Sequence, residues 1–241
     1  MYRGILPDRI TFNILIDSHC KDGMMEDAWG LFILMDKLNI PPDHITYNSM
    51  MHGLCLVGRL QEAIEQFDSM ADRGLEPDEF HYNALLDGYG KKHKMDEAMQ
   101  LFKKMKQNGS KPTTFTYTTL LAGLYRDGRM KTAKNLFNEM QAFGQSPDEV
   151  VCNAVLNGLC KNGKMEEAIE LFESLESIGV SANIEMYYIL ISGFCHVGKL
   201  EDARRHFNDI PRKGLVPNVV TYTAMITGLF RNKMLLEEHI N

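Results

Sequence analysis

Residues 44–78 read HITYNSMMHGLCLVGRLQEAIEQFDSMADRGLEPD, and this pattern of 35 residues recurs along the chain without insertion or deletion. In every complete copy the twentieth residue is Ala and the twenty-fourth is Phe. The copies are 9–43, 44–78, 79–113, 114–148, 149–183, 184–218 and a partial seventh copy, 219–241. A fixed period of this length predicts a solenoid, in which each copy packs on its neighbours.

Each copy is expected to form two antiparallel helices. Gly58 and its equivalents follow a run of apolar and small residues, which predicts the left-handed end of a first helix of about ten residues. A second helix of about fourteen residues follows, and it ends near Gly74, before Pro77, or at the equivalent positions. The predicted fold class is all-α, with antiparallel helix pairs that form one solenoid domain.

The two ends of the chain differ from the complete copies. Residues 1–8 match the end of a preceding copy, and Met1 falls where the second helix of that copy would run. We therefore expect a window of a longer array that carries no targeting peptide. Lys233 replaces the turn glycine and Glu238 the core alanine, which predicts a frayed or specialised end. Apolar surface at either terminal repeat could drive self-association.

The composition excludes a membrane protein. Apolar residues make up 44% of the chain and charged residues 24%, and no apolar run approaches the roughly 18 residues of a membrane span. Four cysteines share the twelfth place of their copies, and the fifth takes a place that is otherwise aromatic: Cys20, Cys55, Cys160, Cys195 and Cys152. We expect them to be core residues rather than disulfide partners.

No site for catalysis, a cofactor, a small-molecule substrate or a metal ion is expected. Residues 158–164 approach a phosphate-binding loop, but Met165 stands where Ser or Thr must hold magnesium, and no strand is predicted before it. The HExxH, HxE and CxxC patterns of zinc enzymes are absent from the sequence. The eight histidines occupy unrelated places of their copies, which argues against a metal site.

We call the equivalent residues of successive copies a column. Three columns lie on one side of the first helix and differ in chemistry. The second place is mostly apolar on an otherwise polar side: Ile10, Ile45, Phe80, Phe115, Val150, Glu185 and Val220. The fifth place mostly carries small amide or hydroxyl groups: Asn13, Asn48, Asn83, Thr118, Asn153, Tyr188 and Thr223. The thirteenth place is mostly basic: Lys21, Leu56, Lys91, Arg126, Lys161, His196 and Arg231. We expect these columns to form an exposed stripe.

Such a stripe suits an extended single-stranded nucleic acid. The bases need a platform for their faces and hydrogen bonds at their edges, and the phosphates need cations. The formal net charge of −6 opposes this hypothesis, because nucleic-acid-binding domains are commonly basic. Many acidic residues stand at the start of the second helix, where the helix dipole favours them. We expect them to lie away from the basic column.

The segments 45–55 (ITYNSMMHGLC) and 74–78 (GLEPD) resemble the pentatricopeptide repeat in its plain 35-residue form, the P class, and the match covers almost the whole chain. The resemblance implies a right-handed superhelical solenoid that binds single-stranded RNA with one base per repeat, usually in mitochondria or chloroplasts. It implies a role in RNA processing, stability or translation by occupancy, without catalysis. The general pattern is similar to the fertility-restorer group of plants.

In that family, the fifth and the last residue of a repeat recognise the base edge, and second-place residues of consecutive repeats sandwich the base. We call the last residues of the copies the closing residues; they are Asp43, Asp78, Thr113, Asp148, Asn183 and Asn218. By the family's code, uracil is preferred by Asn13 with Asp43 and by Asn48 with Asp78. A pyrimidine is preferred by Asn83 with Thr113, and guanine by Thr118 with Asp148. Asn153 with Asn183 prefers cytosine over uracil, and Thr223 indicates a purine.

The resemblance also assigns the other two columns. Stacking falls to the apolar second-place residues, which are Ile10, Ile45, Phe80, Phe115, Val150 and Val220. Phosphate binding falls to Lys21, Lys91, Arg126, Lys161 and Arg231. The sixth copy departs from the pattern at Ala182, Glu185 and Tyr188, which flank one base site and predict a spacer that tolerates any nucleotide. The expected target is roughly 5′-UUYGYNR-3′.

Three other interpretations are open. The fifth-place residues could serve only as helix caps, although capping does not account for the apolar second place or for the closing residues. The basic column could serve only the negative end of the first helix. The chain could also be a protein-binding scaffold of the tetratricopeptide type, but that repeat has a period of about 34 residues and a Trp-x-x-Leu-Gly-x-x-Tyr pattern that these copies lack.

Overall fold

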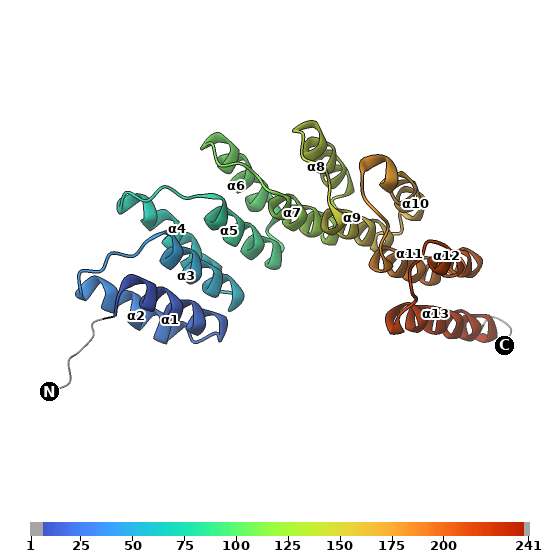
Figure 1. Ribbon diagram of the computed structural model, residues 1–241, viewed down its shortest axis with the longest axis horizontal. Coiled ribbons are helices and arrows are strands. Elements are labelled where there is room, and N and C mark those ends of the chain that lie inside the picture. Colours follow the sequence, from blue (N-terminus) through green and yellow to red (C-terminus); the bar gives the residue numbers. More distant parts are fainter. Residues whose placement is uncertain (1–6, 239–241) are drawn as a thin grey trace. The chain divides into compact units, whose positions relative to one another are not determined.

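The computed structural model describes the backbone of residues 7–238 and the side chains of residues 7–232. Every regular element in this part of the chain is a helix, and corresponding helices begin 35 residues apart (Figure 1). The first helices of the copies are α1 (Arg9–Lys21), α3 (His44–Leu56), α5 (Glu79–Lys91), α7 (Thr114–Arg126), α9 (Glu149–Lys161), α11 (Ile184–His196) and α13 (Val219–Glu238). The second helices are α2 (Met25–Lys37), α4 (Leu60–Asp72), α6 (Met95–Gln107), α8 (Met130–Ala142), α10 (Met165–Ser174) with a 3₁₀ turn (Leu175–Ile178), and α12 (Leu200–Arg212). The expected all-α helical repeat array is confirmed.

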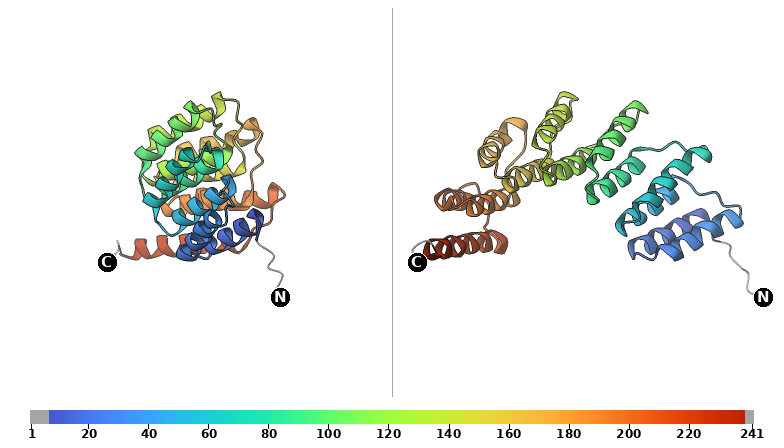
Figure 2. Two further views of the ribbon diagram at one scale, coloured as in Figure 1. Left: turned by 90° about the vertical axis from the view of Figure 1, so that its left-hand side faces the viewer. Right: turned by 180° about the vertical axis from the view of Figure 1, so that it is seen from behind.

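The chain divides into two compact units, one up to Gly123 and one from Leu124. In the first unit α1, α3 and α5 lie side by side, and each packs on the second helix of its own repeat (Figures 1 and 2). In the second unit α9, α11 and α13 have the same arrangement, with α10 and α12 on one side of them. The first helices therefore form a continuous layer within each unit.

The invariant Phe column packs between consecutive repeats. Phe32 of α2 meets Tyr47 of α3 edge to face, with ring centroids 5.6 Å apart. The same pair recurs as Phe67–Tyr82, Phe102–Tyr117, Phe172–Tyr187 and Phe207–Tyr222, at 5.1–5.7 Å. Each such pair contributes about 0.5–1.5 kcal/mol beyond the burial of its area. The twenty-fourth place is thus aromatic because it joins one repeat to the next.

A column of glycines lets the first helices approach closely, and the sequence analysis did not identify it. A Cβ atom on Gly53 would lie 2.6 Å from Cys20 Cβ, and one on Gly158 would lie 2.3 Å from Tyr125 Cγ. The twelfth place of one repeat therefore packs against the tenth place of the next. This contact explains why the twelfth place so often carries the small side chain of cysteine.

All five cysteines are buried and free, as expected for core residues. Burial raises the pKa of the Cys55 and Cys160 thiols to about 12 in each case, so both stay protonated at neutral pH. Such thiols are poor nucleophiles and poor metal ligands.

The first helices are longer than expected, because the closing residues cap them. In α1, α3, α5, α9 and α11 the helix has 13 residues instead of about ten. The side chain of Asp43 accepts the backbone N–H of Thr46 at 3.0 Å, and Asp8, Asp78, Asp148 and Asn183 cap their helices in the same way. A cap of this kind is worth about 0.5–2 kcal/mol. Capping therefore belongs to the closing residues and not to the fifth place.

The seventh copy differs from the others in its first helix. The left-handed residue that follows each complete first helix is a glycine in five copies, such as Gly58 with a φ of 78°, and His93 in the third; Lys233 stands at this place in the seventh. As a result α13 continues without interruption to Glu238 and has 20 residues. The helix is continuous to Glu238, and the expectation of a frayed or specialised end stays a prediction for residues 239–241, which lie outside the described residues. Of the helices in the described part of the chain, none combines the length and apolarity that crossing a bilayer requires.

Candidate functional site

The apolar second-place side chains are all exposed, as the sequence predicts. Each lies at the second residue of a first helix, where it projects from the layer that these helices form. Ile10, Ile45, Phe80, Phe115, Val150 and Val220 are between 49% and 68% exposed. Large apolar side chains exposed at a regular spacing are unusual on a protein that has no partner for them. This row is the first component of the candidate site.

The fifth-place side chains of the six complete repeats are buried or half-buried, deeper than the exposed stripe that we expected, and only that of Thr223 in the partial seventh copy is exposed. Asn13 is only 8% exposed and Asn83 only 9%. The Thr46 hydroxyl donates to Asn13 Oδ1 at 2.6 Å, and Asn13 Nδ2 donates to Asp43 Oδ1 at 3.1 Å. The fifth-place residue, the closing residue and the third residue of the next repeat therefore meet in one hydrogen-bonded group below the exposed second place.

This group holds Asp43 as an ionised acceptor. Burial by itself would raise the pKa of the Asp43 carboxyl. Hydrogen bonds from the Thr46 backbone, the Thr46 hydroxyl and Asn13 lower this pKa, as does the nearby Arg9 guanidinium, and together they outweigh the effect of burial. The net effect lowers the pKa of Asp43. One amide hydrogen of Asn13 is left to point at a ligand, because its other hydrogen is used by Asp43.

The third repeat shows a complete slot. A pocket of about 430 Å³ is lined by Phe80 and Phe115 from consecutive first helices, with Asn83 and Thr113 among its other residues. Thr116 Oγ1 donates to Asn83 Oδ1 at 2.7 Å and lies 3.2 Å from the Thr113 hydroxyl. Two flat aromatic side chains thus share one hollow with the fifth-place and closing residues that the sequence assigns to this repeat.

Acidic side chains bind both the fifth-place and the closing residue of the fifth repeat. Asn153 Nδ2 donates to Glu185 Oε2 at 2.8 Å, and Asn183 Nδ2 donates to Glu149 Oε2 at 2.9 Å. Asn153 Oδ1 is buried and has no hydrogen-bond partner. The sequence predicts that Glu185 disturbs the sixth site. The structure adds that its carboxylate engages the fifth-place residue of the preceding repeat, 32 positions away.

The sixth repeat still has a hollow beside Tyr188. A pocket of about 360 Å³ is lined by Tyr188, Val220, Thr223 and Arg231, among others. The Thr223 hydroxyl donates to the backbone oxygen of Val219 at 2.7 Å, and Thr118 makes the equivalent bond to Thr114 at 2.8 Å. Each Thr at the fifth place therefore offers oxygen lone pairs, where an Asn also offers an N–H donor.

The predicted phosphate-binding residues are all exposed. Four of them lie in the last turn of their helices, whereas α13 continues beyond Arg231 to Glu238. Lys21 pairs with Asp17, and Lys91 Nζ lies 2.7 Å from Asp87 Oδ2. Exposed ion pairs contribute about 0–1 kcal/mol, so a phosphate could replace either carboxylate. Arg126, Lys161 and Arg231 occupy the equivalent places. At the first four places the position also fits the negative end of the helix dipole, so both interpretations of this column stay open, but Arg231 lies inside α13 and does not fit it.

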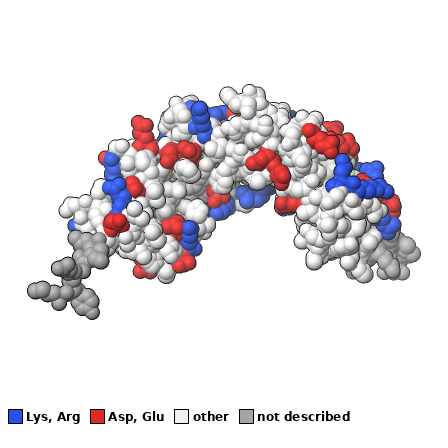
Figure 3. Space-filling model, viewed as in Figure 1, with Lys and Arg blue, Asp and Glu red and all other residues white. Residues whose placement is uncertain are grey.

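The acidic residues at the start of the second helices have partners of their own. Arg59 Nη1 binds Glu26 at 2.8 Å, and Lys199 Nζ binds Glu166 at 3.2 Å. These pairs join the starts of consecutive second helices. On the face that Figure 3 shows, Lys and Arg lie in small groups beside Asp and Glu, and no broad area has a single sign. On this face, any attraction for a polyanion is therefore local.

The comparisons with known proteins agree with this geometry. The PPR repeat family matches residues 7–56, 45–80, 77–126, 113–150, 147–196 and 182–231. The crystal structure of the pentatricopeptide repeat protein PPR10 from maize is similar to this chain with a TM-score of 0.71 and 26% sequence identity, over 92% of this chain and 32% of that chain. PPR10 in complex with an 18-nt psaJ RNA element is similar with a TM-score of 0.66 and 26% identity, over 92% and 36% of the two chains.

A third similar structure is the PPR domain of Arabidopsis thaliana protein-only RNase P 1 in complex with tRNA. Its TM-score is 0.59 and its identity 17%, over 74% of this chain and 94% of that one, which is a likeness of fold. The chain spans about a third of the length of PPR10. The search of curated protein sequences gives no match.

Proposed function

Because this chain belongs to the pentatricopeptide repeat family, we propose that it binds single-stranded RNA and that each repeat holds one base. The observation that carries this proposal is the slot of the third repeat, where Phe80 and Phe115 flank a pocket that also contains Asn83 and Thr113. Stacking on aromatic side chains contributes about 1–3 kcal/mol per base. The similarity to PPR10, whose structure was solved in complex with an RNA element, supports the same ligand.

The hydrogen-bonded group of the first repeat fits uracil. The remaining N–H of Asn13 can donate to a carbonyl oxygen of the base, and the ionised Asp43 can accept its ring N–H. We propose the same arrangement for Asn48 with Asp78. The full target is the 5′-UUYGYNR-3′ that the family's code assigns, with the fifth and sixth positions weakened by Glu185.

The proposed biological role is that of a specificity factor of the P class. The bound array would keep a strand extended and unpaired, or block a nuclease or ribosome on it, without catalysing a reaction itself. In line with its family, the chain would act on RNA of mitochondria or chloroplasts, in processing, stability or translation.

Replacing Thr118 tests the proposed base recognition. The protein should prefer the RNA 5′-UUCGCAA-3′ over the same strand with uracil in place of guanine, and Thr118→Asn should reverse the preference. The variant adds an N–H donor at the base edge, so we expect a change of about 0.5–1.5 kcal/mol, or about 2- to 12-fold, the net value of one hydrogen bond. Fluorescence anisotropy with labelled strands at two salt concentrations measures both affinities.

A protein that binds the two strands equally, before and after the substitution, would contradict base recognition by this repeat. A protein that retains neither strand would contradict RNA binding itself and would leave a helical scaffold for a protein ligand.

Removing the Glu185 carboxylate is expected to strengthen RNA binding. Glu185→Val restores the apolar second place found in six of the seven copies, frees Asn153 and removes a negative charge beside the strand. We expect a gain of about 1 kcal/mol, or about fivefold, the lower end of the value for one stacked base. Glu170→Val, which removes an exposed carboxylate from the second-helix layer, is the matched control. An equal gain in both variants would mean that net charge alone is responsible.

A further inference from the structure

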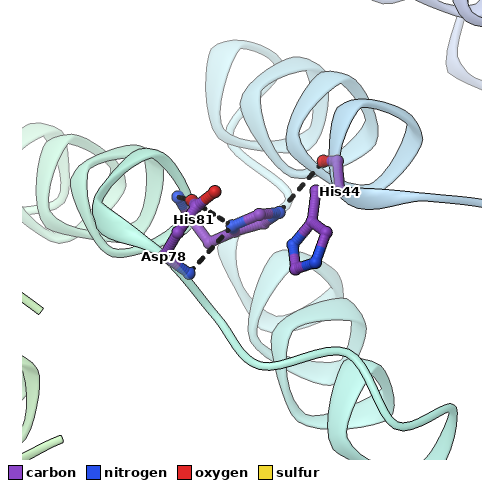
Figure 4. Close-up of side chains that lie close together, drawn as sticks. All are labelled: His44, Asp78 and His81. Atoms are coloured by element: carbon purple, nitrogen blue, oxygen red, sulfur yellow. Dashed lines mark hydrogen bonds and ion pairs between the residues drawn. The ribbon is translucent and has the colours of Figure 1, made fainter. Parts of the chain in front are cut away.

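Two histidines and an aspartate from different repeats meet at the junction between α3 and α5. His44 is the first residue of α3, Asp78 caps α5, and His81 is the third residue of α5. One ligand atom from each of the three lies within 4.8 Å of the other two. Figure 4 shows the His81 ring between Asp78 and the backbone of His44, with the His44 ring beside it. The sequence analysis did not anticipate this cluster, because the three residues occupy unrelated places in their repeats.

The hydrogen bonds of His81 determine where its lone pair points. Its Nε2 lies 3.0 Å from the backbone oxygen of His44. A carbonyl oxygen can only accept, so Nε2 carries a proton and donates it. In the neutral ring the lone pair is then on Nδ1. A metal-binding histidine commonly donates its other N–H to a backbone carbonyl in this way, which fixes the ring and its tautomer.

The lone pair of His81 faces a carboxylate. Nδ1 of His81, whose side chain is only 1% exposed, lies 2.6 Å from Asp78 Oδ1 and accepts a longer hydrogen bond from the Asp78 backbone N–H at 3.3 Å. Two acceptors at this distance repel each other unless a positive species, a proton or a metal ion, lies between them. His44 Nδ1 is also buried and has no hydrogen-bond partner. A third possible ligand atom, His44 Nδ1, therefore stands unused beside this nitrogen and oxygen.

We propose that His44, Asp78 and His81 bind one zinc ion. Two imidazoles and one carboxylate suit Zn²⁺, and they leave the fourth tetrahedral position to water. Bonds of about 2.0–2.2 Å place tetrahedral ligand atoms roughly 3.3–3.6 Å apart. The cluster would reach this geometry if the His81 and Asp78 side chains separated slightly and the His44 ring turned toward them.

The site would also act on RNA recognition, a consequence that rests on the proposed function. Asp78 is the closing residue of the second repeat, and a carboxylate bound to zinc is less able to accept the N–H of a base. Zinc should therefore weaken the binding of RNA with uracil at the second position, and that RNA should weaken zinc binding by the same factor.

The third place offers a matched test. Four other copies carry Thr where this one has His81: Thr11, Thr46, Thr116 and Thr221. Thr46 and Thr116 bond to the preceding closing residue, so His81→Thr should keep the junction folded. In protein without an affinity tag and free of RNA, we expect one Co²⁺ or Zn²⁺ per chain by visible absorption or calorimetry. His81→Thr and His44→Thr should each weaken binding at least about tenfold, since loss of even an outer partner costs about 10- to 100-fold.

His52→Asn is the control for nonspecific histidine binding. His52 is exposed in the same unit, and Asn157 occupies the equivalent place, so this variant should bind the ion as the parent does. The proposal would be overturned if His81→Thr bound the metal ion as tightly as the parent, or if the parent bound none. A cobalt–thiolate absorption band would also overturn it, because the ion would then be bound by a cysteine. If zinc binds but does not change RNA binding, the metal site is retained and only its proposed effect on uracil recognition by Asp78 is overturned.

Discussion

Replacing Phe80 and Phe115 together by Ala is expected to weaken RNA binding by about 5- to 150-fold. The two side chains are about 60% exposed and line the slot of the third repeat from both sides. Loss of stacking on one base costs about 1–3 kcal/mol, and each Phe also borders a neighbouring slot, so the effect should be the largest of any pair in the row. Anisotropy with the 5′-UUCGCAA-3′ strand measures the loss.

The same double variant should fold normally, because neither phenylalanine belongs to the buried core. Its thermal unfolding midpoint should match that of the parent. Phe143→Ala serves as the control, since Phe143 is 70% exposed but lies at the end of α8, in the second-helix layer. If this control loses as much RNA affinity as the double variant, RNA binding depends on the total exposed aromatic area and not on the position of the aromatic side chains. An unchanged affinity in the double variant would remove the stacking row from the proposed interface.

Replacing Gly158 by Val is expected to destabilise the second unit by about 1–3 kcal/mol, the usual cost of overpacking a core. A Cβ atom at this position would lie 2.3 Å from Cγ and 2.6 Å from Cβ of Tyr125. The Cβ atom of Tyr125 is fixed by the backbone, so rotation of the side chain cannot remove the clash, and the backbone at Tyr125 and Gly158 would have to separate. Thermal unfolding should show a midpoint lower by roughly 2–12 °C, at about 2–4 °C per kcal/mol for a chain of this size.

Gly30→Ala provides the opposite expectation. Gly30 lies inside α2, and a Cβ atom there would meet nothing within 4 Å. Alanine should stabilise the helix by up to about 1 kcal/mol. If both variants unfold at the temperature of the parent protein, close approach of the first helices does not limit the stability of the array.

The sequence alone determined the repeat, its register and the alternation of helices. These features depend on local signals: apolar residues at helical spacing, glycines that end helices, and prolines that prevent their continuation. The exposure of the second place also followed from periodicity, because residues such as Ile45 and Phe80 stand on the side of the helix opposite the core. The predicted stacking row therefore did not depend on knowledge of the tertiary structure.

Only the tertiary structure decided how the columns meet one another. It buries Asn13, makes Asp43 both a helix cap and a partner of Asn13, and brings Glu185 to Asn153. The contacts that matter join residues about 30 to 37 positions apart. A periodic sequence shows which residues are equivalent, but the distances between unlike columns depend on how closely neighbouring helices stack. That spacing is set by side-chain packing across the repeats, and here the tenth-place glycines permit it.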